Sequence, residues 1–169
     1  MTVSSIFHKL IFYVKSYFRI YCLNTLGEPI FVPFSGDIPS DASSEYRVHL
    51  AVYRKTPYRA IVHAHPPFAV AASLVMDEII PLDSEGEMFC PRIPVLAGAP
   101  GTQHLADIVA EAMVHARLVI ARGHGTFAAG ATLDEVYILT SLAEHASKVI
   151  AFKNIYAQKS GSFIRLSEF

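Results

Sequence analysis

The sequence contains no tryptophan and only two cysteines, Cys22 and Cys90, among its 169 residues. Two cysteines cannot build the disulfide framework of a small secreted protein, so we expect the reducing environment of the cytoplasm. Charged residues are also scarce, at 17%. Hydrophobic residues make up 52%, which excludes an intrinsically disordered chain. This share is slightly above the usual one, and the surplus favours buried contacts between subunits.

The chain also lacks an excess of charge of either sign and a long uncharged apolar run. Lysine and arginine total 14 against 15 aspartates and glutamates, and because nucleic acid binding needs a basic surface, we expect no nucleic acid partner. The most apolar stretch, 3–22, is interrupted by the basic side chains of His8, Lys9, Lys15 and Arg19. It fits neither a membrane-spanning helix nor a signal peptide. We expect it to pack on the body of the protein as helix or strand; the alternative is an amphipathic helix on a membrane or partner.

The length fits one domain, and strand-like and helix-like patterns alternate along it. Apolar residues at helical spacing predict helices over 45–53, 67–76, 102–115 and 133–158. Short apolar runs predict strands at 60–65, 79–82, 93–96, 118–121 and 126–129, besides short strands within 20–44. We expect a turn at 83–86. This alternation predicts the α/β class.

Three histidines follow predicted strands in a pattern typical of a metal site. His63 and His65 stand at positions i and i+2 of a strand end, so their side chains share a face. His124 lies between Gly123 and Gly125, where glycine lets the backbone turn sharply and approach a ligand closely. Three imidazoles with an open fourth position are a ligand set of catalytic zinc. The residues alone leave open whether these are metal ligands or ordinary partly buried histidines.

Glu45 is the candidate acid–base group, because it stands at the start of a predicted helix, where the helix dipole favours a carboxylate. A plain first-turn carboxylate is the alternative. His49 follows Glu45 by four residues, which predicts an ordinary side-chain pair on one helical face. We expect surface positions for His104 and His115 and a packed position for His145.

Three motifs occur in a fixed order along the chain. They are Ser43-Ser44-Glu45-x3-His49-Leu50-Ala51-x-Tyr53, then Ala60-Ile61-Val62-His63-Ala64-His65-Pro66, then Gly123-His124-Gly125. Together they resemble the class II aldolase/adducin family over about 23–158, which leaves 1–22 as an apolar segment outside the resemblance and 159–169 as a C-terminal tail. The resemblance implies a three-layer α/β/α fold with a largely antiparallel central sheet. It also implies a homotetramer with sites between neighbouring subunits.

The resemblance further implies a zinc-dependent aldolase that cleaves a ketose phosphate, such as L-fuculose 1-phosphate, to dihydroxyacetone phosphate and a short aldehyde. The implied roles are metal ligation by His63, His65 and His124, with Zn²⁺ or another divalent transition metal, acid–base catalysis by Glu45, and binding of the substrate phosphate by Ser43 and Ser44. A related epimerase branch has aspartate at the position of Glu45, so the glutamate favours the aldolases. The alternatives are a dehydratase, epimerase or decarboxylase of the same family, or a non-catalytic adducin-like scaffold.

Two features that family members normally carry are missing from this sequence. Residues 1–30 hold neither a Gly-Asn-x-Ser phosphate loop nor a Thr-Pro-x-Gly segment, so we expect a chain that starts late relative to the family. The tyrosine that bacterial fuculose-phosphate aldolases use beyond the H-x-H strand is absent from 82–86. We therefore expect a different substrate or a different proton donor.

Overall fold

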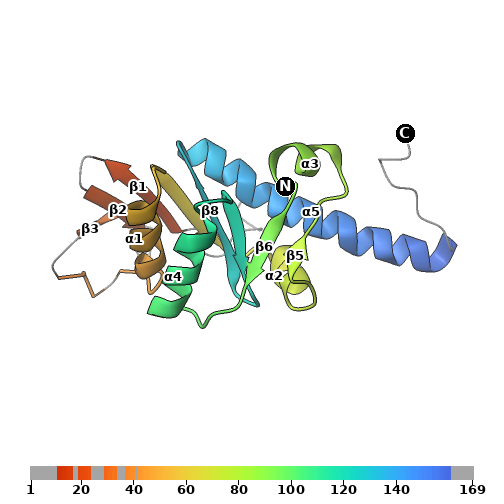
Figure 1. Ribbon diagram of the computed structural model, residues 1–169, viewed down its shortest axis with the longest axis horizontal. Helices are drawn as coiled ribbons and strands as arrows, with labels where there is room; N and C mark the ends of the chain where they lie inside the picture. The colour runs from red at the N-terminus through yellow and green to blue at the C-terminus, as the bar shows by residue number, and fades with distance from the viewer. Residues whose placement is uncertain (1–10, 17–18, 24–28, 34–36, 41, 161–169) are drawn as a thin grey trace.

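The computed structural model describes residues 11–16, 19–23, 29–33, 37–40 and 42–160, which form a sheet between two layers of helices (Figure 1). The strands are β1 (Ile11–Ser16), β2 (Arg19–Leu23), β3 (Pro29–Pro33), β4 (Ala60–Ala64), β5 (Glu78–Ile79), β6 (Ile93–Leu96), β7 (Leu118–Ala121) and β8 (Gly125–Gly130). The helices are α1 (Tyr46–Lys55), α2 (Pro67–Ser73), α3 (Ser84–Phe89), α4 (Gln103–Ala112) and α5 (Leu133–Ser160).

The described strands form one sheet in the order β3-β2-β1-β4-β8-β7-β6-β5. Each neighbouring pair in this order is antiparallel except β6 and β7, which confirms the expected largely antiparallel sheet. Because β8 runs against both β4 and β7, the strands β4, β6 and β7 point in the same direction. Their carboxyl ends therefore lie at one edge of the sheet, where ligands of α/β proteins commonly bind.

Alternate residues of the central strands face opposite helical layers, as the period of a strand requires. Ile61 of β4 and Phe127 of β8 are fully buried in a cluster with residues of α1 and α4. Val62 of β4 and Ile120 of β7 are fully buried in a second cluster, with residues of α5. The helices α2 and α3 pack against α5 on that second side. The sheet is thus covered on both faces, which confirms the three-layer architecture.

The structure departs from the sequence-based expectations between 79 and 89. A helix, α3, replaces the turn expected at 83–86, because the Asp83 side chain accepts a hydrogen bond from the Gly86 N–H at 2.8 Å and so caps the first turn. The strand expected over 79–82 is shorter and shifted, ending at Ile79 in β5. Pro81 lies just beyond it and has no N–H to donate to a strand ladder.

The described part of the apolar N-terminal stretch joins the sheet. β1 pairs with β4 on one side and with β2 on the other, both antiparallel. The described residues of the stretch therefore form strands packed on the body of the protein, and the amphipathic-helix alternative is wrong for 11–16 and 19–22; residues 3–10 and 17–18 lie outside the described part. Among the described residues, no helix combines the length and the apolarity needed to cross a membrane.

Candidate metal centre

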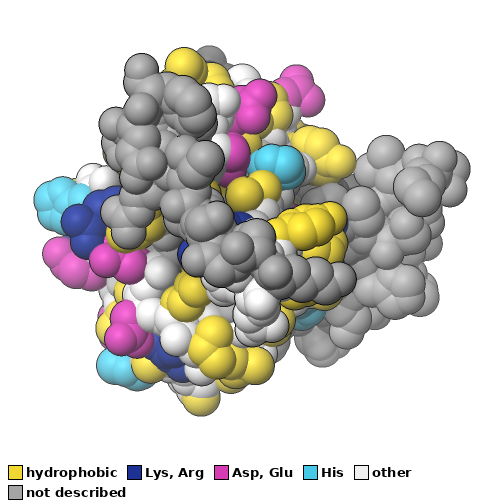
Figure 2. Space-filling view, turned by 90° about the vertical axis from the view of Figure 1, so that its right-hand side faces the viewer, with side chains coloured by type: hydrophobic (Ala, Val, Ile, Leu, Met, Phe, Trp, Pro, Cys, Tyr) yellow, Lys and Arg dark blue, Asp and Glu magenta, His cyan; other side chains and the backbone are white. Residues whose placement is uncertain are grey.

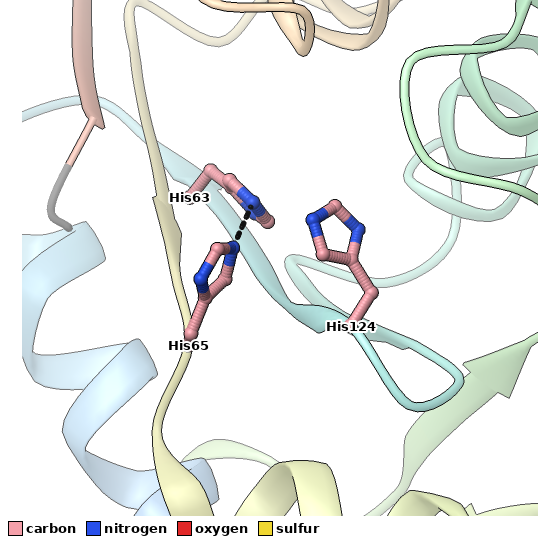
Figure 3. A group of neighbouring side chains, drawn as sticks. All are labelled: His63, His65 and His124. Carbon is pink, nitrogen blue, oxygen red and sulfur yellow. Dashed lines mark hydrogen bonds between the residues drawn. The ribbon is translucent and has the colours of Figure 1, made fainter. Parts of the chain in front are cut away.

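Three histidine side chains meet at the edge of the sheet where β4 ends and β7 turns into β8 (Figure 3). His63 lies on β4, His65 directly beyond its end, and His124 in the turn between β7 and β8. One ring nitrogen of each histidine lies within 4.8 Å of those of the other two. The convergence expected of these rings is present in the structure, and metal binding by them stays a prediction.

His63 is the buried member of the group, with 1% of its surface exposed. Its Nδ1 donates a hydrogen bond to the carbonyl oxygen of Thr126 at 2.9 Å, which leaves Nε2 to face the other rings. That Nε2 lies 2.8 Å from Nε2 of His65, as the dashed line in Figure 3 marks. Phe127 stands opposite His63 in the β4–β8 register and stacks on its ring, with centroids 4.2 Å apart. Two neighbours therefore fix the orientation of this imidazole.

His65 and His124 leave one side of the group open, since His65 is exposed and His124 is half-buried. The Nδ1 of His124 is itself buried and has no hydrogen-bond partner among the described residues. Buried polar atoms in native structures nearly always have a partner, so an orphaned imidazole nitrogen calls for an explanation. A divalent metal ion held by three imidazoles provides one, and the donor set fits zinc.

Burial keeps two of these imidazoles neutral. It lowers the pKa of His63 well below its usual value, and the nearby His65 and His124 lower it further. Burial and, to a smaller extent, His65 lower the pKa of His124 to about 4. Neutral imidazole is the form that ligates a metal, so no proton has to be displaced from these two rings at neutral pH.

The turn that carries His124 needs both of its glycines. Gly123 has a φ of +65°, in the left-handed region that side chains disfavour. Gly125 lies directly against β4, where a Cβ would come within 2.3 Å of the Ala64 carbonyl oxygen and 2.6 Å of His65 Cδ2. The absence of side chains at these two positions is what brings His124 beside the histidines of β4.

Glu45 lies at the N-cap position of α1 and is only 2% exposed. Its Oε1 accepts a hydrogen bond from the Gly101 N–H at 2.9 Å, in the loop that follows β6. Its Oε2 is buried and has no hydrogen-bond partner among the described residues. Burial raises the pKa of this carboxyl, and the bonds from Gly101 and Ser44 oppose that rise. A carboxyl with a raised pKa and a free oxygen is suited to proton transfer.

The two serines before Glu45 both contact it. The backbone N–H of Glu45 donates to Ser43 Oγ at 3.3 Å, and Ser44 Oγ donates to Glu45 Oε1 at 3.5 Å. Ser43 is half-buried and Ser44 is exposed, so the Ser44 hydroxyl can be reached from solvent. Phosphate binding by these serines stays a prediction.

His49 and Phe127 are parts of the site that the sequence-based analysis missed. His49 is fully buried, and its ring stands edge-on to Phe127 with centroids 6.2 Å apart. It also lies close enough to His63 to lower the pKa of that ring. Because Glu45 precedes His49 by one helical turn, this contact directs the same face of α1 toward the histidine group. The sequence did carry a signal for the burial of His49: its neighbours on α1 include the apolar residues Val48 and Val52, which are also buried.

Three further histidines of the described residues, His104, His115 and His145, lie on the surface away from this site. His104 and His115 are exposed, as expected. The packed position expected for His145 is wrong, because His145 lies on the exposed side of α5.

Comparison with known proteins shows which family the chain resembles over most of its length. Residues 19–151 match the sequence model described as Class II Aldolase and Adducin N-terminal domain. An L-fuculose phosphate aldolase of Methanococcus vannielii is 32% identical over 114 residues, which cover 66% of this chain and 62% of that protein. A protein of the same name from Methanococcus maripaludis is 28% identical over 114 residues, with the same two coverages of 66% and 62%. The chain thus spans less than two thirds of the length of these relatives.

A solved structure shows the same fold over nearly the whole chain. The L-fuculose-1-phosphate aldolase from Thermus thermophilus is 32% identical, superposes with a TM-score of 0.86, and matches 95% of this chain and 91% of that one. The sequence match and the shared fold lead to one conclusion: the chain belongs to the class II aldolase and adducin family.

Proposed function

We propose that this chain is a zinc-dependent aldolase that cleaves a ketose phosphate resembling L-fuculose 1-phosphate to dihydroxyacetone phosphate and a short aldehyde. The observation that carries the proposal is the convergence of three imidazole nitrogens within 4.8 Å at one edge of the sheet. The relatives named L-fuculose phosphate aldolase support the substrate class.

The three histidines would hold the metal, each through one ring nitrogen. Bound zinc would supply a Lewis acid that stabilises negative charge on the substrate oxygens while the carbon–carbon bond breaks. His63 is prepared for this role, because the Thr126 carbonyl fixes its tautomer and Phe127 fixes the plane of its ring. The exposed His65 leaves the open side from which a substrate would enter.

Glu45 would transfer the proton that cleavage requires. The Gly101 N–H holds Oε1 in place, and the buried Oε2, which has no hydrogen-bond partner among the described residues, would be the oxygen that exchanges the proton. The raised pKa of this carboxyl brings its titration closer to working pH, where a general acid or base is most effective. Ser43 and Ser44 would bind the substrate phosphate at the N-terminus of α1, where helix geometry favours anions.

Metal analysis together with an assay for dihydroxyacetone phosphate tests the proposal. The purified wild-type chain should bind zinc and release dihydroxyacetone phosphate from L-fuculose 1-phosphate. His124→Ala should lose both properties, because two histidines do not complete the ligand set. His104→Ala is the matched control, since His104 is an exposed histidine of α4 and its removal should change neither.

Glu45→Gln separates metal binding from proton transfer. This variant should keep zinc, because no ligand is removed, and should lose turnover by about 10²–10⁴-fold, the usual scale of acid–base catalysis. Zinc binding by the wild-type chain without cleavage of ketose phosphates would contradict the aldolase and favour a dehydratase, epimerase or decarboxylase. A chain that binds no metal would favour the adducin-like scaffold.

A further inference from the structure

One short helix, α2, lies between the segments that carry His65 and His124. It follows His65 along the chain and is hydrogen-bonded to the turn that carries His124. This helix begins at Pro67, two residues after His65, and ends at Ser73, which contacts the β7–β8 turn. Side chains from other elements hold both of its ends. The position of α2 therefore affects how far apart the two histidines lie.

Arg122 connects the C-terminal end of α2 to the turn that carries His124. Its Nη1 donates to the carbonyl oxygens of Ser73 at 2.7 Å and of Met76 at 3.2 Å. Its Nη2 pairs with Asp77 at 2.5 Å, but the Asp77 side chain is 98% exposed, and such surface ion pairs contribute little. The two carbonyl oxygens are therefore the partners that matter, and both lie at the end of α2 or just beyond it.

Ser73 makes a second connection at the same place. Its side chain is fully buried, and its hydroxyl donates to the Val70 carbonyl at 2.7 Å. The same oxygen accepts a hydrogen bond from the Gly123 N–H at 2.9 Å. Gly123 directly precedes His124, so this bond holds the backbone at the residue before the histidine.

Glu144 holds the opposite end of α2. It is a buried residue of α5, and its Oε2 accepts hydrogen bonds from the N–H groups of Phe68 at 2.9 Å and Ala69 at 3.1 Å. A shift of α2 along its axis would break these buried bonds, and a buried donor left without a partner is costly. The helix is thus fixed to α5 at one end and to the His124 turn at the other.

His124 depends on such support more than His63 does. The ring of His63 is fixed by a hydrogen bond to Thr126 and by the stacked Phe127. His124 has glycine on both sides, and its Nδ1 has no hydrogen-bond partner among the described residues. The His124 N–H donates to the Ala121 carbonyl at 3.0 Å and so closes the turn. Because glycine gives the backbone more freedom than any other residue, this one local bond does not by itself fix the position of His124.

We propose that Arg122 and Ser73 are positioning residues that hold His124 at the distance from His63 and His65 that a shared metal ion requires. They act through the backbone of Gly123 and His124 and touch neither metal nor substrate. Ligand distances in metal sites tolerate only about 0.2 Å of deviation, so loosening the turn weakens binding. This inference rests on the metal centre proposed above.

Zinc affinity and the cobalt spectrum of purified variants test this inference. In a chelator competition, Arg122→Gln and Ser73→Ala should bind zinc about 10–100-fold more weakly than wild type, the usual effect of removing a group that orients a ligand. The ligand-field bands of the Co²⁺-loaded variants should shift, which a loss of stability alone would not cause. Arg122→Lys should restore part of the affinity, because an ammonium group can donate to the same carbonyls.

Arg92→Gln is the matched control. Arg92 also pairs with a carboxylate, Glu78, but on the exposed side of the molecule, so this variant should keep wild-type affinity and spectrum. If Arg122→Gln fails to fold by circular dichroism, Ser73→Ala decides the outcome. Wild-type zinc affinity and cobalt spectrum in the folded variants would overturn the positioning role alone. A wild-type chain that binds neither zinc nor cobalt would overturn the metal centre and this inference with it.

Discussion

At the scale of single residues, the candidate site combines groups whose charge is suppressed by burial. His63 and His124 have lowered pKa values, and Glu45 has a raised one, each chiefly because burial disfavours the charged form. Neutral imidazoles favour metal binding, and a carboxyl with a raised pKa favours proton exchange with a substrate. Burying these three ionisable groups lowers the stability of the fold, but it also gives each group the protonation behaviour that its proposed role requires.

Glu45→Gln should raise the free energy of unfolding of the metal-free chain at neutral pH, because it removes a buried carboxylate. The pKa of Glu45 is raised above its usual 4.5 in the folded state, so the folded chain holds this proton more tightly than the unfolded chain. The resulting contribution to stability is complete below pH 4.5 and is lost as pH rises through the folded pKa. At pH 7 Glu45→Gln should therefore be more stable than wild type, because its amide keeps the Gly101 bond without a buried charge.

Denaturant unfolding at pH 7 and at pH 4 measures this difference. The advantage of the variant should shrink toward the lower pH, where Glu45 takes up its proton. A variant less stable than wild type at pH 7 would show that the ionised carboxylate is favourably bound, and would contradict the effect of burial described above.

At the scale of elements, α2 is held by a carboxylate from another helix. Glu144→Ala removes the acceptor of the Phe68 and Ala69 N–H groups and should lower the free energy of unfolding by about 1–3 kcal/mol, the cost of unsatisfied buried donors. Glu144→Gln is the matched control, because its amide oxygen can still accept both bonds. Chemical denaturation compares the two variants, and equal stability would contradict the role of Glu144 as the acceptor at this helix end.

At the scale of the whole molecule, the C-terminal part of α5 extends beyond the sheet (Figure 1). Phe152 and Ile155 are each 50% exposed, and Tyr156 is 70% exposed. Figure 2 looks onto the end from which α5 projects, and hydrophobic side chains lie exposed among charged ones there. Exposed apolar surface that is contiguous usually marks a contact with another chain.

We expect the chain to self-associate, with a homotetramer as the state that the family resemblance implies. Light scattering on the purified chain measures its mass in solution. Ile155→Glu should shift the mass toward smaller species, because burying a charge in an apolar contact is costly. Val114→Glu, at an exposed apolar position after α4, is the control and should keep the wild-type mass. A monomer at all micromolar concentrations would contradict the tetramer.

Much of the histidine group was predictable because its signals are local. The side chains of His63 and His65 lie on one face because side chains alternate along a strand, and the glycines beside His124 predict a sharp turn. The same reasoning located helices and strands from apolar spacing but failed at 83–86. There the Asp83 side chain bonds the N–H of Gly86, three residues later, and this sequence spacing is compatible with either a turn or the first turn of a helix.

The sequence by itself determined most of the elements, the family motifs and the residues that could carry the chemistry, since periodicity and turn chemistry act over a few residues. Only the tertiary structure decided that the Gly101 N–H holds Glu45, 56 positions away, that Phe127 stacks on His63, and that Arg122 reaches the end of α2. These contacts follow from strand order and register. Strand order is set by which apolar faces can be buried together across the whole molecule, and no short stretch of sequence contains that information.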